Sequence, residues 1–297
     1  MLSQSLIDQI VSQVVSQITP GAAPAAPAPS AASHAPVPGA EQGSAGLEDI
    51  TSPEQKAVPL LAHPTDRDAL MRMKGRTPAR IGVGRAGPRL NTKTMLTLRA
   101  DHAAARDAVF LDVDEKLMES LGLFSVSTQC ADKNEFVTRP DLGRDFSEEA
   151  LETIRSRCQK NPQVQILVCD GLSSTAVGAN VPDLLPVLMD GLKAKGISAG
   201  TPFFVKNGRV AAQDRVAEVL GATVVCSLIG ERPGLATAES LSAYISYEAR
   251  VGMPEARRTV VSNIHKDGIP AVEAGAYIAD LIETILKARA SGVDLKK

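Results

Sequence analysis

QVQILVCDGLSSTAVGAN, residues 163–180, is the stretch of sequence that decides the fold of this 297-residue chain. Its first half, residues 164–168, is nearly all apolar, which is typical of a parallel strand that is buried on both faces of a sheet. After Cys169 the residues become polar, beginning with Asp170 and continuing through three hydroxyl side chains. Ligands of open α/β sheets bind at the carboxyl ends of strands, so this stretch predicts a ligand-binding edge.

A second strand and loop of the same kind follow at residues 223–234, where TVVCSLI precedes GERPG. Parallel neighbouring strands end at the same edge of a sheet, so we expect the two loops to line one crevice. Asp170 and Glu231 are the carboxylates of these loops. Each can accept hydrogen bonds from a bound molecule or cap a following helix, and the residues alone leave both roles open.

The chain alternates between strands and helices from residue 161 to its end. The pattern predicts strands at 164–169, 202–205, 223–229 and 259–262, and helices at 182–195, 213–220, 239–247 and 270–290. Strands separated by helices of this length favour right-handed crossovers. We therefore expect an α/β fold with a Rossmann-like parallel sheet flanked by helices.

Residues 47–160 are predicted to form a smaller, mainly helical domain. Capping residues and apolar spacing indicate helices at 66–73, 92–108, 114–121 and 147–160. A literal GxGxxG stands at residues 82–87, but prolines interrupt its approach and follow it at once, so we do not interpret it as a dinucleotide fingerprint. It is better read as a glycine-rich turn that presents Arg85 and Arg89 to a partner chain or an anionic group.

The first 46 residues divide into two segments. Residues 1–19 place apolar side chains at spacings of three and four, which predicts an amphipathic helix. Residues 20–46 are rich in Ala, Pro, Gly and Ser and are predicted to be a disordered linker. The helix either packs back on its own domain or on a second copy, or it serves as a docking peptide, and the residues alone leave these open.

Composition and missing motifs exclude several classes of function. The net charge of −2 does not indicate the excess of basic residues that is typical of nucleic-acid-binding proteins. No run of apolar residues is long enough to cross a membrane. The scattered cysteines, none in a CxxC pair, favour buried thiols in a reducing cytoplasm: Cys130, Cys158, Cys169 and Cys226. No metalloprotease, P-loop or serine-hydrolase motif occurs, so we predict no catalytic residue and no metal site in this chain.

Several stretches together resemble one known family. They are GRAGPR at 84–89, ADH at 100–102, DKN at 132–134, TRPDLGR at 138–144, DGLSS at 170–174, GTPFFVKNGRV at 200–210, GERPG at 230–234, ESLS at 239–242 and SNIH at 262–265. In this order and spacing they resemble the small (light) chain of adenosylcobalamin-dependent ethanolamine ammonia-lyase. The resemblance covers about residues 75–295.

The resemblance implies a bacterial carbon–nitrogen lyase that converts ethanolamine to acetaldehyde and ammonia. It implies that this chain is inactive alone, that the substrate site lies in a large TIM-barrel subunit, and that several large–small pairs form a hetero-oligomer. It also implies that residues 161–297 bind adenosylcobalamin in the base-on form, between the two chains. The positions that match the family's cofactor contacts are Val210, Glu231 and Val260, the last of which departs from the family's cysteine.

The N-terminal segment resembles the encapsulation peptides of enzymes in bacterial microcompartments. This resemblance implies location in a cytoplasmic microcompartment, with shell proteins as further partners of residues 1–19. A second hypothesis does not depend on either resemblance. In this hypothesis the chain is a noncatalytic α/β binding or scaffold protein that docks through its N-terminal helix.

Overall fold

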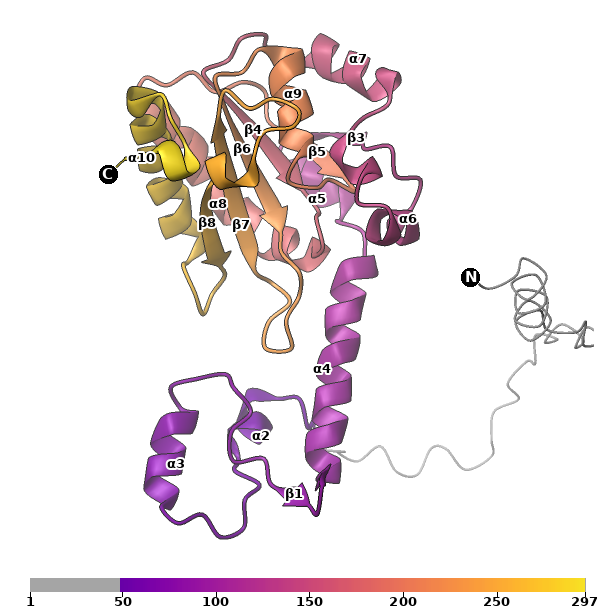
Figure 1. Ribbon diagram of the computed structural model, residues 1–297, viewed down its shortest axis with the longest axis vertical. Helices are drawn as coiled ribbons and strands as arrows, with labels where there is room; N and C mark the ends of the chain where they lie inside the picture. The colour runs from indigo at the N-terminus through magenta and orange to yellow at the C-terminus, as the bar shows by residue number, and fades with distance from the viewer. Residues whose placement is uncertain (1–48, 297) are drawn as a thin grey trace, which may run out of the picture. The chain divides into compact units, whose positions relative to one another are not determined.

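The computed structural model describes residues 49–296, which form one compact unit (Figure 1). The predicted helix at 1–19 and linker at 20–46 lie outside the described residues. From residue 49 to residue 157 the elements are α2 Pro53–Ala57, α3 Arg67–Lys74, β1 Arg85–Ala86, β2 Arg89–Leu90, α4 Thr92–Phe110, α5 Glu115–Ser120, β3 Phe124–Ser127, α6 Lys133–Thr138, η1 Leu142–Arg144 and α7 Glu148–Arg157.

The remaining elements alternate as the sequence predicts. They are β4 Val164–Cys169, α8 Ser174–Ala194, β5 Phe203–Lys206, α9 Ala212–Leu220, β6 Val224–Gly230, β7 Leu241–Tyr247, η2 Glu255–Arg257, β8 Thr259–Ile264, α10 Ala271–Ala288 and η3 Gly292–Asp294. Six strands form one sheet in the order β3-β5-β4-β6-β7-β8. The first four strands of this order run parallel, whereas β7 is antiparallel to both β6 and β8.

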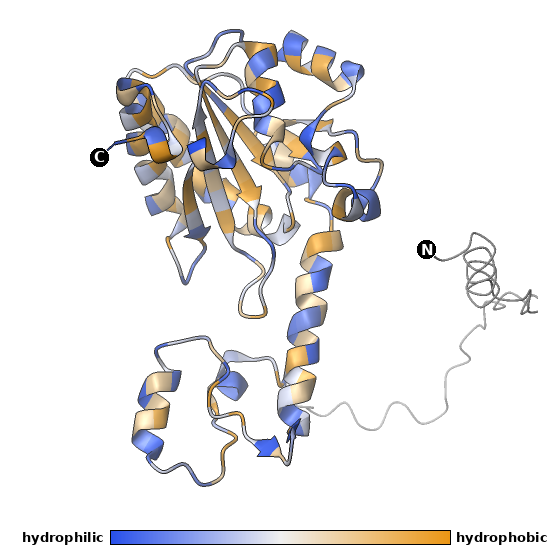
Figure 2. Ribbon diagram, viewed as in Figure 1, coloured by the Kyte–Doolittle hydropathy of each residue, from blue (hydrophilic) through white to orange (hydrophobic). Residues whose placement is uncertain are grey.

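Helices cover both faces of the sheet, and each face has its own apolar core. On one face, α8 packs against β4 and β6, and α10 packs against α8, β7 and β8. On the other face, α9 packs against β6, and α7 packs against α9 and β3. Every residue of β4 and of β6 is buried, and Figure 2 shows these central strands coloured mainly as hydrophobic. Burial on both faces explains why the two strands read as continuous apolar runs.

The α/β fold is confirmed, together with most of the predicted elements. Four predicted helices begin within one residue of the predicted start, and their N-caps are Asp66, Asn91, Asp114 and Ser147, each of which accepts a hydrogen bond from a backbone N–H of the helix that it begins. The end of α9 is as predicted, with Gly221 in the left-handed conformation at φ 68°.

Three predictions are wrong in detail. Residues 241–247 form strand β7 instead of a helix, and because β7 is antiparallel the sheet is mixed rather than wholly parallel. Helix α8 begins at Ser174, eight residues before the predicted start, and it contains Pro182 and Pro186. Its burial between the sheet and α10 outweighs the hydrogen bonds that these prolines remove. Residues 124–127, which were predicted to lie in a helical region, form β3 at the edge of the sheet.

The GxGxxG stretch does not form a strand–loop–helix unit. Residues 85–90 form a short antiparallel hairpin of β1 and β2. Helix α4 begins only after this hairpin, at Thr92, and its N-cap is Asn91. The structure therefore agrees with the reading of this stretch as a turn that presents arginine side chains.

A buried ion pair connects α9 to the start of β8. The guanidinium of Arg258 donates to both carboxylate oxygens of Asp214, at 2.7 and 2.8 Å. The two side chains are 1% and 3% exposed. Burial raises the pKa of Asp214, and the hydrogen bonds from Arg258 act in the opposite direction. This pair fixes the position of the strand that carries Val260.

Replacing Arg258 by methionine should lower the free energy of unfolding by about 3–5 kcal/mol, because Asp214 then stays buried without its counter-ion. The matched control is Arg257→Met, which removes a half-exposed partner of Asp294 and should cost at most about 1 kcal/mol. Urea unfolding of both variants measures the difference. Equal losses would show that the buried pair has no special role.

Candidate functional site

The carboxyl ends of β5, β4 and β6 lie side by side because the three strands are parallel neighbours. The residues that follow them are Asn207, Asp170 and Glu231, respectively. The loops after β4 and β6 therefore start side by side, since Cys169, the last residue of β4, pairs with Ile229. Neither carboxylate caps a helix, since Ser173 is the N-cap of α8 and no helix follows Glu231.

Asp170 is buried and joins three segments of the chain. One carboxylate oxygen forms an ion pair with Lys133 at the first turn of α6, and the other accepts a hydrogen bond from the backbone N–H of Gly208 at 3.2 Å. Burial raises the pKa of the Asp170 carboxyl, while the ammonium of Lys133 and the neighbouring amides act in the opposite direction. Asp170 thus holds the loop after β5 instead of facing solvent.

The loop after β5 is also held from its other side. Arg209 stacks over the ring of Phe136 at 4.2 Å and donates to the carbonyl oxygen of Phe136 at 2.6 Å. The backbone N–H of Arg209 donates to the carbonyl of Gly143 at 2.8 Å. Three of the quoted motifs therefore meet at the carboxyl ends of the central strands: DKN at 132–134, DGLSS at 170–174 and the NGR of 207–209.

The loops after β4 and β6 pack so closely that two glycines are required. A Cβ atom on Gly230 would lie 2.1 Å from the carbonyl oxygen of Ser173 and 2.5 Å from that of Asp170. A Cβ atom on Gly171 would lie 2.3 Å from the carbonyl oxygen of Gly230, and Gly171 has a φ of +55°. Larger residues at either position would push the two loops apart.

Tyr244 links two of the predicted cofactor positions. Its phenol oxygen donates to the carboxylate of Glu231 at 2.7 Å, and its backbone pairs with Val260 on β8. Burial and the hydrogen bond to Glu231 raise the pKa of Tyr244, so the phenol stays protonated and remains a donor. Directly paired residues of antiparallel strands point to the same face, so Tyr244 and Val260 share one face of the sheet. Val260 is 45% exposed there.

Val210 lies between the loop after β5 and the start of α9. It is half-buried and packs against the same apolar cluster as Tyr244, on the α9 side of the sheet. Val210, Tyr244 and Val260 therefore lie on the α9 side of the sheet, and Glu231 is joined to this side by its hydrogen bond with Tyr244.

Two buried polar atoms near this face lack hydrogen-bond partners within residues 49–296. They are the side-chain oxygen of Asn207, in the loop after β5, and the hydroxyl oxygen of Ser242, two residues before Tyr244 in β7. Buried polar atoms are normally paired with protein groups or ordered water, so these two atoms have hydrogen-bonding capacity that the described residues leave unused.

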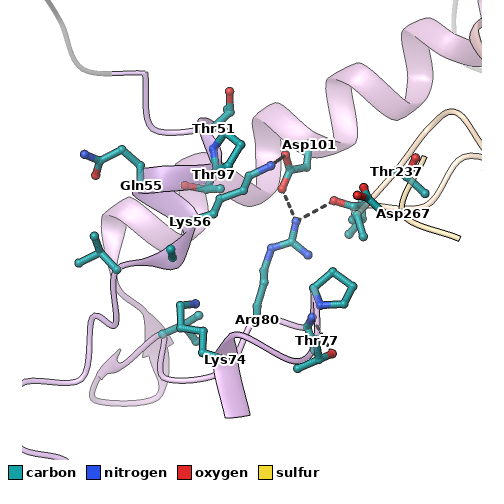
Figure 3. Close-up of a pocket in the computed structure, with 18 of the residues that line it drawn as sticks. Thr51, Gln55, Lys56, Lys74, Thr77, Arg80, Thr97, Asp101, Thr237 and Asp267 are labelled. Carbon is teal, nitrogen blue, oxygen red and sulfur yellow. Dashed lines mark hydrogen bonds and ion pairs between the residues drawn. The ribbon is translucent and has the colours of Figure 1, made fainter. Parts of the chain in front are cut away.

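A further cavity lies elsewhere in the described part of the chain. It measures about 710 Å³ and is lined by α2, α3, α4 and the segments around Leu235 and Asp267. Figure 3 shows Lys56 and Arg80 converging on Asp101 in this cavity, and Arg80 also donates to the carbonyl of Leu235 at 3.2 Å. None of the three predicted cofactor positions lines it.

The described residues contain no cluster of three metal-ligating side chains, and no helix among them is long and apolar enough to span a membrane. All four cysteines are buried and unpaired, as the sequence predicts. Burial raises the pKa of the Cys158 thiol to about 11 and those of Cys169 and Cys226 to about 12, so these thiols are protonated at neutral pH. None of them is a ready nucleophile.

Sequence reasoning did not assign roles to Lys133, Asn207, Arg209 or Tyr244. The first three stood inside quoted motifs, but nothing in the sequence showed that those motifs meet. A signal for Tyr244 was present: the alternation of apolar and other residues in LSAYISY, 241–247, has the period of two that is typical of a strand.

These features define an α/β protein with a mixed sheet whose loops after β4, β5 and β6 are held together at the carboxyl ends of these strands. The family model described as ethanolamine ammonia-lyase light chain (EutC) matches residues 67–296. The ethanolamine ammonia-lyase small subunits of Clostridium tetani, Fusobacterium nucleatum and Listeria monocytogenes are similar to this chain, at 59%, 56% and 53% identity over 250 residues. Each alignment covers 84% of this chain and 85% of the relative. The chain therefore belongs to the ethanolamine ammonia-lyase light chain family and is a lyase component.

Replacing Lys133 by methionine should lower the free energy of unfolding by about 3–5 kcal/mol at pH 7.5, because Asp170 remains buried without its counter-ion. Without Lys133 the pKa of Asp170 rises further, so between the usual value of 3.8 and this raised value the folded chain binds a proton that the unfolded chain lacks. The loss should therefore shrink as the pH falls.

Urea unfolding at pH 7.5 and pH 5 measures this effect. The control is Lys160→Met, which changes an exposed lysine and should alter stability little at either pH. A loss for Lys133→Met that is the same at both pH values would contradict the assigned role of Asp170.

Proposed function

We propose that this chain is the small subunit of an adenosylcobalamin-dependent ethanolamine ammonia-lyase and that it helps to hold the cofactor against a large TIM-barrel subunit. Family membership supports the lyase component, and it favours this function over that of a noncatalytic scaffold. The observation that carries the cofactor role is the hydrogen bond of Tyr244 to Glu231 together with the pairing of Tyr244 and Val260, which groups the three residues around β7. We further propose that several large–small pairs form the complete enzyme.

The residues at this edge fit the chemistry of a corrinoid. A corrin ring is large and partly apolar and carries amide side chains, so it requires apolar contacts together with separate hydrogen-bonding groups. Val210 and Val260 supply partly exposed apolar surface, and Glu231 supplies a hydrogen-bond acceptor.

Each residue of the edge has a separable task in this proposal. Tyr244 holds the carboxylate of Glu231 in one orientation, and Glu231 accepts a hydrogen bond from an amide of the cofactor. Val260 contacts the cofactor through its backbone and its methyl groups, so the absence of a cysteine thiol at this position is tolerated. The bound cofactor supplies the radical chemistry that the described residues lack.

Two observations favour base-on binding, and the first concerns His265. His265 has both ring nitrogens engaged, one with the Asn263 side chain at 2.8 Å and the other with the backbone N–H of Asp267 at 3.2 Å. The sequence has no Asp-x-His-x-x-Gly motif, which would supply a histidine as the lower ligand of cobalt. We therefore propose that the cofactor keeps its own base on the metal.

Glu231→Ala should raise the cobalamin dissociation constant of the assembled enzyme about ten- to hundredfold, because one charge-assisted hydrogen bond is lost at about 1.5–3 kcal/mol. Tyr244→Phe should cause a smaller rise, since Glu231 stays in place but loses its orienting donor. Spectrophotometric titration with adenosylcobalamin measures both constants. Glu273→Ala, which removes an exposed carboxylate on α10, is the control. Wild-type affinity in Glu231→Ala would remove Glu231 from the cofactor site.

We propose that residues 1–19 are an encapsulation peptide that directs the enzyme to a bacterial microcompartment through its shell proteins. A helix of this length needs a surface that covers its apolar stripe, and burying half of the eight apolar side chains at about 1.5–3 kcal/mol each would order it on docking.

Deletion of residues 1–45 should leave the activity of the assembled enzyme unchanged and abolish its co-sedimentation with shells. The full-length enzyme in the same shell preparation is the reference. Loss of assembly with the large subunit, or unchanged shell association, would show that the segment is a structural element.

A further inference from the structure

One segment of the chain is strongly basic although the chain as a whole is not. Residues 69–100, here called the basic arm, contain eight arginines and lysines and neither aspartate nor glutamate, whereas the whole chain has a net charge of −2. The arm comprises most of α3, the hairpin of β1 and β2 and the first half of α4. It includes the glycine-rich turn that presents Arg85 and Arg89.

Most of this charge is exposed and unneutralised. Five arginines of the arm are exposed: Arg72, Arg76, Arg85, Arg89 and Arg99. Within residues 49–296, the arm makes one ion pair, between Arg80 and Asp101. Asp101 lies in α4, one residue beyond the end of the arm. The remaining positive charge therefore lacks a counter-charge in the described part of the chain, and it creates a field that attracts an acidic partner.

The arm also exposes apolar side chains among its arginines. Met71, Met73 and Leu96 are 41%, 56% and 44% exposed, and Figure 2 shows hydrophobic as well as hydrophilic residues on α3 and α4. Leu70 and Thr94 are the only buried residues of the arm. A segment with so small a core gains stability from a partner that covers it, and arginine and methionine are enriched in protein–protein interfaces.

The mixture of residues favours a protein over a nucleic acid as the occupant. Residues 49–109 contain no Phe, Tyr or Trp, and aromatic side chains are the usual platforms on which the bases of single-stranded nucleic acids stack. Exposed methionine and leucine side chains add nothing to phosphate binding, but they match the apolar centre of a protein interface surrounded by a charged rim.

We infer that the basic arm is a docking surface for the large subunit, on which it meets an acidic surface with an apolar centre. This inference rests on the proposed function, since that function supplies the partner. The arm and the proposed cofactor contacts are separate segments of the chain, although Arg80 of the arm donates to the carbonyl of Leu235 in the loop after β6 at 3.2 Å. The small subunit then contacts its partner at two places, one that shares the cofactor and one that is electrostatic.

The test compares two triple variants of the full chain. Arg72→Gln, Arg76→Gln and Arg89→Gln together remove three exposed arm charges that make no ion pair within residues 49–296. The control, with Lys160→Gln, Lys193→Gln and Arg250→Gln, removes three exposed charges from the rest of the chain. Affinity for the purified large subunit is measured without cofactor at 50 and 300 mM KCl, and circular dichroism checks the fold of each variant.

The arm variant should bind the large subunit about tenfold more weakly at 50 mM KCl, and its affinity should depend less on salt than that of the wild type. The control should bind like the wild type. Met73→Glu should also weaken binding, at either salt concentration, because it places a charge in the apolar part of the interface.

Four results would overturn the inference, and they are distinguishable. Wild-type affinity of the arm variant, or an equal loss in the control, would contradict the arm alone and leave the proposed function standing. Arm-dependent binding of a 20-nucleotide single-stranded DNA, with unchanged affinity for the large subunit, would identify a polyanion site instead. No measurable binding between the wild-type chain and the large subunit would contradict the proposed function and the inference together.

Discussion

The burial of Asp170 is the constraint on which the candidate site depends. A carboxylate at the end of a fully buried strand must be paired, and its partners come from α6 and from the loop after β5. Satisfying this one side chain therefore fixes three loops relative to each other. The contact of Gly171 with Gly230 adds the loop after β6, so the position of Glu231 follows from the same arrangement.

The antiparallel strand β7 provides Tyr244, which connects Glu231 to Val260 in the candidate site. A wholly parallel sheet would place a helix after β6, whereas here β7 returns directly and brings Tyr244 beside both Glu231 and Val260. The edge strand β8 keeps one face exposed, with Val260 on it. The central strands thus provide rigidity, and the edge of the sheet provides a surface that a cofactor and a partner subunit can share.

The sequence was most informative where local chemistry and burial agree. Continuous apolar runs predicted β4 and β6, and capping residues predicted the starts of four helices. It was misleading where tertiary packing outweighs local signals. Pro182 does not mark the start of α8, because one side of this helix is buried on both sides of the proline. Residues 241–247 were predicted as a helix because several of them have adequate helix propensity, but they form β7. The ion pair of Lys133 with Asp170 joins residues 37 positions apart, and no single-sequence pattern indicates such a contact.

The central claim is that this chain provides one side of a shared cofactor site and no catalysis of its own. The most direct test is ammonia release from ethanolamine by this chain, the large subunit and adenosylcobalamin together, with each component omitted in turn. The account predicts turnover only when all three are present. Turnover by this chain and cofactor without the large subunit, or full activity of the large subunit without this chain, would contradict it.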